Sequence, residues 1–186
     1  MKFMIASDLH GSAYYVEKLL KTFEESGADR LLLLGDLLYH GPRNDLPRDY
    51  NPKLVIPMLN EHRDDIICVR GNCDADVDQM TLTFPITAEN AILWHGSRMI
   101  FATHGHVFNT ENIPPLKKGD ILLHGHTHVP VIVDFGGEKG KDFTYLNPGS
   151  VSIPKEGSRH SYMIFEDGKF TWYDLETGEA YMYYDM

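Results

Sequence analysis

Short, uninterrupted apolar runs recur in the first part of this 186-residue chain. The clearest is Leu31–Leu34, four leucines in a row, and the centres of Lys2–Ser7 and Ile66–Val69 are similar. Runs of this kind are typical of strands that are buried on both faces, as in parallel sheets. Because parallel neighbours need a crossover connection, usually a helix, the chain has to bury such a sheet beneath helices.

The segments between these runs have helical spacing. Ser12 is a suitable N-cap and Gly27 a suitable stop for a first helix, whereas Pro52 fits the first turn of a second helix that Pro57 would weaken or kink. The apolar positions that recur along the two helices are Val16, Leu19, Leu20 and Phe23, then Leu54, Val55, Met58 and Leu59. This order of elements predicts a βαβαβ unit.

The second half of the chain is rich in strand signals. Two strands are expected around a turn at His95–Ser97, and further strand-like runs follow, separated by turns that contain Gly or Pro. Two sheets packed face to face with helices outside would use all of these elements. We therefore predict an α/β fold, a four-layer α/β/β/α sandwich of two mixed β-sheets flanked by helices, in a single domain of residues 1–186.

The formal net charge of −10 argues against stable binding to nucleic acid or to a membrane surface. An acidic protein can still act on phosphate if bound metal ions supply positive charge. The chain has two cysteines, a short N-terminal apolar stretch and no run of membrane-spanning length, so we expect it to be cytoplasmic. Aromatic residues near the C-terminus could cover the edge of the core or a subunit contact, as in a homo-oligomer (dimer or tetramer).

Residues that commonly bind metals follow five of the apolar runs. They are Asp8, His10, Asp36, Asn72, His104, His126 and His128. In open α/β sheets, ligands bind in the crevice beyond the carboxyl ends of the strands, so these side chains are expected to converge. Any one of them alone could be a cap or a turn residue, and their joint occurrence is what indicates a site.

This set contains two carboxylates, one amide and four imidazoles, which is too many for one tetrahedral zinc ion. It suits two divalent ions if one carboxylate bridges them, and two ions roughly 3.5–4 Å apart are the arrangement that clamps a phosphoryl group. A set of nitrogen and oxygen ligands favours Mn²⁺, Fe²⁺, Zn²⁺, Co²⁺ or Ni²⁺ over metals that prefer thiolates.

The motifs that carry these residues resemble those of the calcineurin-like metallophosphoesterases. They are DLH at Asp8–His10, GD at Gly35–Asp36, GNCD at Gly71–Asp74, HGH at His104–His106, GHTH at Gly125–His128 and NPGS at Asn147–Ser150. They occur in the order of that family and cover roughly residues 1–152. Within the superfamily, the chain is most similar to the small bacterial and archaeal phosphodiesterases.

The resemblance implies a phosphodiesterase with two divalent ions, for which we expect Mn²⁺, with Ni²⁺, Zn²⁺, Fe²⁺ and Co²⁺ as alternatives. The implied ligands are Asp8, His10 and His128 for the first ion, Asn72, His104 and His126 for the second, and Asp36 bridging both. A hydroxide shared by the ions would attack the phosphorus of a small-molecule diester. Asp36, Asn72 and Cys73 would form the catalytic group.

Cys73 is a departure, because larger family members carry His there and give it a role in protonating the leaving group or steadying the phosphate. A thiol is smaller and a poorer proton donor, so we expect diesters to be preferred over monoesters. His40, Arg43 and His106 are further candidate substrate contacts, although a solvated loop or a structural role would explain each equally well. His124 is more simply interpreted as a structural histidine.

Other activities could use the same site, namely phosphomonoester, cyclic-nucleotide or nucleotide pyrophosphate hydrolysis. A non-catalytic metal-binding scaffold is an alternative of a different class. One member of the superfamily, the retromer subunit, resembles the phosphodiesterases yet serves protein assembly with a degraded metal site. All seven ligand positions are intact in this chain, which favours an enzyme.

Overall fold

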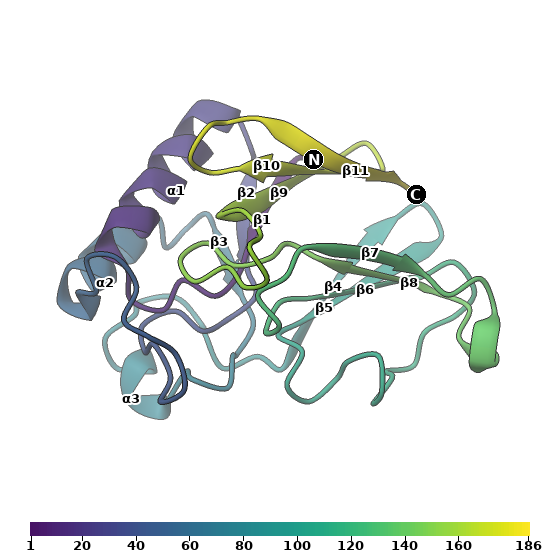
Figure 1. Cartoon of the computed structure of the whole chain (residues 1–186), viewed down its shortest axis with the longest axis horizontal. Coiled ribbons are helices and arrows are strands. Elements are labelled where there is room, and N and C mark those ends of the chain that lie inside the picture. Colours follow the sequence, from purple (N-terminus) through teal and green to yellow (C-terminus); the bar gives the residue numbers. More distant parts are fainter.

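The computed structural model describes residues 1–186, apart from the side chain of Lys139. Figure 1 shows two β-sheets that lie against each other, with the helices at one side of the molecule. The first sheet has the strand order β11-β10-β9-β1-β2-β3. Its strands are β1 (Phe3–Ala6), β2 (Arg30–Leu33), β3 (Ile66–Cys68), β9 (Ser161–Glu166), β10 (Lys169–Asp174) and β11 (Ala180–Asp185). The sheet is mixed, because β1, β2 and β3 are parallel and the other pairs are antiparallel.

The second sheet has the order β4-β5-β6-β8-β7. Its strands are β4 (Asn90–His95), β5 (Arg98–Thr103), β6 (Ile121–His124), β7 (Val131–Asp134) and β8 (Thr144–Asn147). The three central strands β5, β6 and β8 are parallel, and β4 and β7 pair antiparallel at the two edges. In each sheet, parallel strands therefore end side by side.

The helices are α1 (Ala13–Ser26), α2 (Pro52–Glu61), the short α3 (Asp76–Gln79) and the 3₁₀ turn η1 (Glu138–Gly140). The Ser12 side chain caps α1 by accepting from the Tyr15 amide, and Gly27 ends it in the left-handed conformation with φ 67°. The second helix begins at Pro52, as expected from the sequence, and continues through Pro57.

Alternation along β1 divides the core into two layers. Phe3 and Ile5 pack between the two sheets, in a cluster that includes Ile121 and Trp172. Met4 points to the opposite face of the first sheet and packs in the cluster that includes the buried residues of α1 and α2. The predicted α/β fold of two mixed sheets with flanking helices is confirmed.

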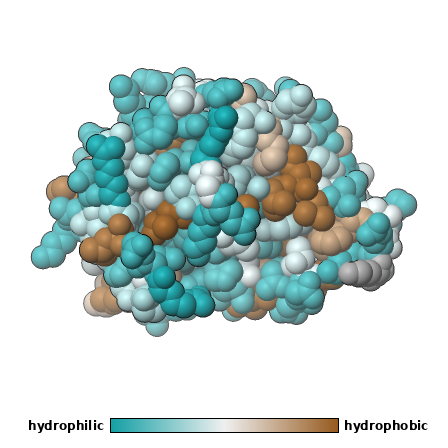
Figure 2. Space-filling model, in the orientation of Figure 1, coloured by the Kyte–Doolittle hydropathy of each residue, from teal (hydrophilic) through white to brown (hydrophobic). Residues whose placement is uncertain are grey.

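The two outer faces are covered differently. On the outer face of the second sheet, Phe101 and Leu122 pack against Phe108 and Leu116, which come from the loop after β5. The chain between β5 and β6, which the structure describes throughout, contains no helix, so that loop covers this face in place of a helix. Among the described residues, no helix is both long and apolar enough to cross a membrane. The face drawn in Figure 2 is mostly hydrophilic, with hydrophobic side chains in small, separate patches.

Candidate active site

The candidate ligands lie in the loops directly after β1, β2, β3, β5 and β6, where the parallel strands of both sheets end. Five of the seven have a left-handed backbone, which is uncommon for residues other than glycine. They are Asp8 (φ 59°), His10 (47°), Asp36 (57°), His126 (66°) and His128 (63°). Such conformations persist where the surrounding structure enforces them, and they are concentrated at functional sites.

Two glycines allow the loops to approach one another closely. A Cβ on Gly71 would overlap the carboxylate of Asp36, and a Cβ on Gly35 would overlap the backbone of Gly71. The loops after β2 and β3 therefore touch through their backbones, which only glycine permits at these positions. This contact brings Asn72 next to Asp36.

The first cluster consists of Asp8, His10 and His128, all buried. Asp8 Oδ1 lies 3.6 Å from His10 Nε2 and 3.3 Å from His128 Nε2, and the two imidazole nitrogens are 3.3 Å apart. The three ligand atoms thus surround a common point, as in a metal site.

The protonation of these imidazoles tests whether a cation fits. His10 Nδ1 lies 2.7 Å from the Tyr39 carbonyl, and His128 Nδ1 lies 2.7 Å from that of Ile153. Since a carbonyl accepts, each Nδ1 carries the proton, which leaves two Nε2 lone pairs facing each other. The buried Asp8 Oδ1 has no hydrogen-bond partner among the described residues. A cation between these atoms would satisfy all three, so the residues fit a divalent ion.

The second cluster surrounds His104. Its Nε2 lies 3.0 Å from Asn72 Oδ1, 3.1 Å from His126 Nδ1 and 3.5 Å from Asp36 Oδ2. Its Nδ1 donates to the Leu34 carbonyl at 2.7 Å, so Nε2 again presents a lone pair. This cluster offers the nitrogen and oxygen donors of a second cation site.

Asp36 lies between the two clusters. Its Oδ2 is 3.7 Å from His10 Nε2 and 3.5 Å from His104 Nε2. Its other oxygen, Oδ1, accepts a hydrogen bond from the Cys73 amide at 2.8 Å, which fixes the carboxylate plane. A carboxylate that faces a donor of each cluster has the placement required of a bridge between two ions.

The titration of these groups reflects their mutual contacts. Burial alone would raise the pKa of Asp8, but the imidazoles of His10 and His128 beside it hold that pKa well below its usual range. Burial lowers the pKa of His10, but the Asp8 carboxylate, the Tyr39 carbonyl and the Asp36 carboxylate together raise it above its usual value. Burial and the neighbouring His104 lower the pKa of His126 to about 4, so its ring is neutral at physiological pH and free to coordinate.

Asp74 supports the ligand loops in a way that the sequence did not reveal. Its buried carboxylate accepts the amides of Asp36 at 2.9 Å, Leu37 at 2.8 Å and Gly71 at 2.8 Å. The only signal in the sequence was its place in the GNCD motif.

The NPGS segment holds the opposite side of the site. Asn147 Nδ2 donates to the Gly125 carbonyl and the Thr127 hydroxyl at 2.9 and 3.0 Å, and Ser150 Oγ donates to the Asp8 carbonyl at 2.9 Å. The loops that carry Asp8, His126 and His128 are thereby tied together.

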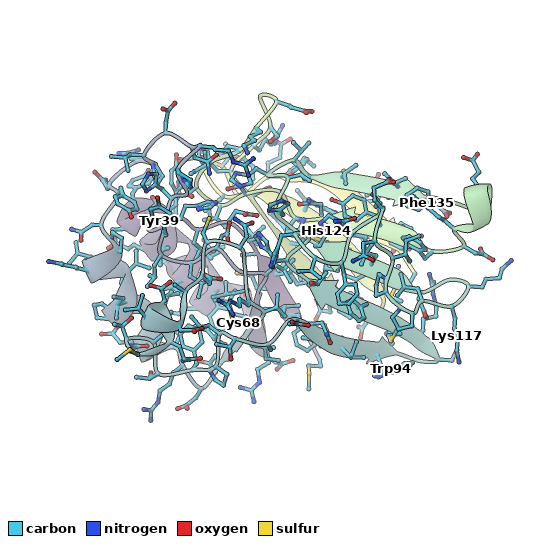
Figure 3. All side chains as sticks on the ribbon, turned by 90° about the horizontal axis from the view of Figure 1, so that it is seen from below. Tyr39, Cys68, Trp94, Lys117, His124 and Phe135 are labelled. Carbon is cyan, nitrogen blue, oxygen red and sulfur yellow. The ribbon has the colours of Figure 1, made fainter. Side chains whose placement is uncertain are left out.

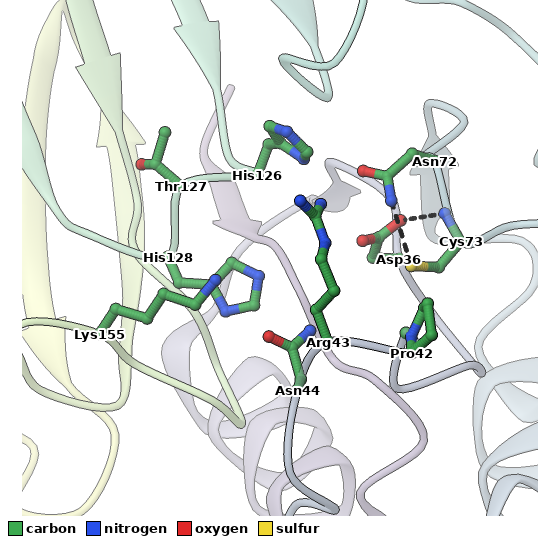
Figure 4. A pocket seen from close by; sticks show the side chains of 11 residues that line it. Asp36, Pro42, Arg43, Asn44, Asn72, Cys73, His126, Thr127, His128 and Lys155 are labelled. Carbon is green, nitrogen blue, oxygen red and sulfur yellow. Dashed lines mark hydrogen bonds between the residues drawn. The ribbon is translucent and has the colours of Figure 1, made fainter.

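A cavity of about 370 Å³ opens above the two clusters. Figure 4 shows the Arg43 guanidinium between His126 and Asn72, and the Lys155 side chain beside His128. The expected contact Arg43 thus lines the cavity, whereas Lys155 was not anticipated, because its place depends on the fold of the loop after NPGS.

Cys73 lines the same cavity, and its Sγ accepts from Asn72 Nδ2 at 3.2 Å. Burial and the nearby Asp36 carboxylate raise the pKa of Cys73 to about 12, so it remains a neutral thiol. It is therefore a weak proton donor at neutral pH, as its residue type suggested.

The remaining histidines lie elsewhere. The His40 ring packs edge-on against Tyr39 and Tyr50, and His40 is not among the residues that line the cavity. His106 lines a neighbouring cavity of about 270 Å³. His124 is buried and stacks on Tyr145 with ring centroids 4.2 Å apart; Figure 3 shows it inside the molecule.

The fold and the ligand loops define a phosphoesterase of the two-sheet type, and the chain belongs to the calcineurin-like phosphoesterase superfamily, whose domain model matches residues 1–168. It is 48% identical over 167 residues to phosphodiesterase YfcE of Escherichia coli K12, which covers 90% of this chain and 88% of that protein. A solved structure of YfcE, described as a phosphoesterase from E. coli, is similar with a TM-score of 0.92 at 44% identity, and covers 100% of this chain and 99% of that one.

More distant structures share the fold alone. A single mutant of Vps29 from Entamoeba histolytica is 20% identical with a TM-score of 0.62, and covers 100% of this chain and 99% of that chain. The match to the superfamily model and the identity to YfcE confirm the resemblance to the calcineurin-like metallophosphoesterases that the motifs indicated.

Proposed function

We propose that this protein is a metal-dependent phosphodiesterase that hydrolyses phosphodiester bonds at a site for two divalent ions. Membership of the phosphoesterase superfamily and 48% identity to a phosphodiesterase support the activity. The observation that carries the two-ion site is the position of Asp36 Oδ2, which lies 3.7 Å from His10 Nε2 in one cluster and 3.5 Å from His104 Nε2 in the other.

The proposed ligands are Asp8, His10 and His128 for one ion, Asn72, His104 and His126 for the other, and Asp36 for both. When bound, the ions would supply Lewis acidity, which offsets charge on the phosphate oxygens and lowers the pKa of water, so that hydroxide is available as the nucleophile at neutral pH. The left-handed backbone at five of the seven ligands restricts where their side chains can lie, which favours a preorganised site.

Arg43 and Lys155 bring positive charge to the cavity of a protein whose net charge is −10. A guanidinium matches two phosphate oxygens with paired hydrogen bonds, so Arg43 would bind and orient the diester. The neutral thiol of Cys73 gives the departing oxygen little help as an acid. Diesters whose leaving groups need no protonation are therefore the substrates that this site favours.

The donor set contains nitrogen and oxygen atoms, which suits Mn²⁺, the ion that we propose, and equally admits Ni²⁺, Zn²⁺, Fe²⁺ or Co²⁺. The diester is proposed to be a small molecule, because the acidic surface disfavours long nucleic acids. A cytoplasmic location, assembly into a dimer or a tetramer, and a single domain over residues 1–186 remain predictions.

Elemental analysis combined with turnover of bis(p-nitrophenyl) phosphate tests the proposal. We expect two ions per chain after loading with Mn²⁺, and in Asp36→Asn a lower metal content and a larger loss of turnover than the roughly 10–100-fold seen for residues that only support ligands. Asp45→Asn, at an exposed acid of the neighbouring loop, is the matched control and should leave both unchanged. Two bound ions without turnover of any diester, monoester or nucleotide pyrophosphate would instead indicate a scaffold.

A further inference from the structure

A second cavity, of about 380 Å³, adjoins the catalytic one. Cys73 lines both cavities, so its side chain forms part of the wall between them. The second cavity lies between the loop after β2, the start of α2 and the short α3, and its lining includes Leu38, Tyr39, Tyr50, Ile56 and Val77. Tyr39 is 43% exposed, so this cavity reaches the surface of the molecule.

The two cavities differ in chemistry. The catalytic cavity presents Arg43, Lys155 and the ligand side chains. The second is walled mainly by aromatic and aliphatic groups, and Asp78 is the only charged residue among those described in its lining. An anionic phosphate would be repelled there, whereas an uncharged apolar group would be removed from water.

A diester has two ester substituents on phosphorus. When the phosphate lies in the catalytic cavity, each substituent needs space beside it. At Cys73 the wall between the two cavities is thin, because the side chain there is small. Gly41 also keeps the wall thin, because a Cβ at that position would lie only 3.2 Å from the Cys73 sulfur. A larger residue at either position would thicken the wall between the two cavities.

We propose that the second cavity binds one ester arm of the substrate, an apolar arm of aryl size, while the phosphate lies over the metal-binding clusters. This inference rests on the proposed phosphodiesterase function. The volume is sufficient, because a closed apolar cavity of about 150 Å³ already binds benzene. The tyrosines of the lining offer aromatic surface for such a group.

Phosphinates test the inference without hydrolysis, because both of their substituents are bound to phosphorus through carbon. Diphenylphosphinate, dimethylphosphinate and bis(hydroxymethyl)phosphinate carry the same charge, and each is symmetric, so either arm can enter the cavity. Calorimetry on the full-length, Mn²⁺-loaded protein gives their Kd values. We expect diphenylphosphinate to bind at least about 10-fold more tightly than the two others, in line with the burial of a ring.

Val77→Asp places a carboxylate in the second cavity, on a side chain that is 63% exposed and so is tolerated by the fold. We expect it to lower the preference for the diphenyl compound about 10-fold, and the uncharged Val77→Asn to lower it less. Val107→Asp is the matched control, because Val107 is also exposed but lines the polar cavity on the Asn72 side. It should leave the preference unchanged.

An unchanged preference in Val77→Asp, or a bis(hydroxymethyl) compound that binds as tightly as the diphenyl compound, would overturn the inference. Failure of the phosphodiesterase function would look different. The wild-type protein would then turn over no diester, while calorimetry would still report which arm the second cavity accepts.

Discussion

Replacing Asp74 with alanine removes the acceptor of three buried amides, those of Asp36, Leu37 and Gly71. A buried donor without a partner costs about 1–3 kcal/mol. Water from the cavity of about 270 Å³ that His106 and Asp74 line can form hydrogen bonds with some of these amides. We therefore expect Asp74→Ala to lower the free energy of unfolding by roughly 3 kcal/mol.

Asp74→Asn keeps the volume and one acceptor oxygen, so a smaller loss of about 1–2 kcal/mol is expected. Burial raises the pKa of Asp74, so a neutral group recovers part of the cost of desolvating the carboxylate. Urea denaturation at pH 7 with a chelator measures the losses without a contribution from metal ions.

Asp76→Ala is the control, since Asp76 is two residues away and exposed. Its ion pair with Arg70 is long, at 3.7 Å, so its loss should cost little stability. In metal-loaded protein, Asp74→Ala should also weaken metal affinity about 10–100-fold, because the three amides hold the loop of Asp36 in place. Equal stability of Asp74→Ala and Asp76→Ala would refute this account of the loops.

Gly71→Ala would drive a Cβ into the Asp36 carboxylate, and we expect elemental analysis to show less than two ions per chain; a normal metal content would contradict the described loop contact. In the metal-free protein, Asp8 and the Tyr39 carbonyl favour the protonated form of His10 and raise its pKa, so an ion that binds there competes with a proton. Calorimetry in buffers of different ionisation heat should thus show proton release on Mn²⁺ binding that declines as the pH rises, and His10→Asn should reduce this release. Cys73→His replaces a thiol of pKa about 12 with an imidazole that can donate at neutral pH, so the ratio of diester to monoester turnover should fall several-fold, whereas Cys73→Ser should not change it. An unchanged ratio in Cys73→His would count against the role given to the thiol.

The elements with strong local signals could be predicted from the sequence. The cap at Ser12, the stop at Gly27 and the buried run Leu31–Leu34 each fix one element through residues that are close in the chain. The four-residue helix α3 and the edge strand β11 were not predicted. The aromatic residues of β11 fitted either of two roles, and the structure shows that Tyr181 and Met182 cover the edge of the core between the sheets.

The candidate ligands could be located because each follows an apolar strand. The contacts of the surrounding residues could not, since they depend on how loops distant in the sequence fold against each other. Lys155 reaches the cavity from the loop after Ser152, whereas His40 turns away from it towards Tyr39 and Tyr50. His95, expected in a turn, is the last residue of β4 and contacts Phe165.

The ligand set is divided between the two sheets. Asp8, His10, Asp36 and Asn72 follow strands of the first, and His104, His126 and His128 follow strands of the second. An ion at either cluster would therefore be bound by residues of both sheets, and would link one sheet to the other. A cut in the loop between β3 and β4 would divide the ligands between two fragments, and we expect metal affinity to return only when the fragments reassociate.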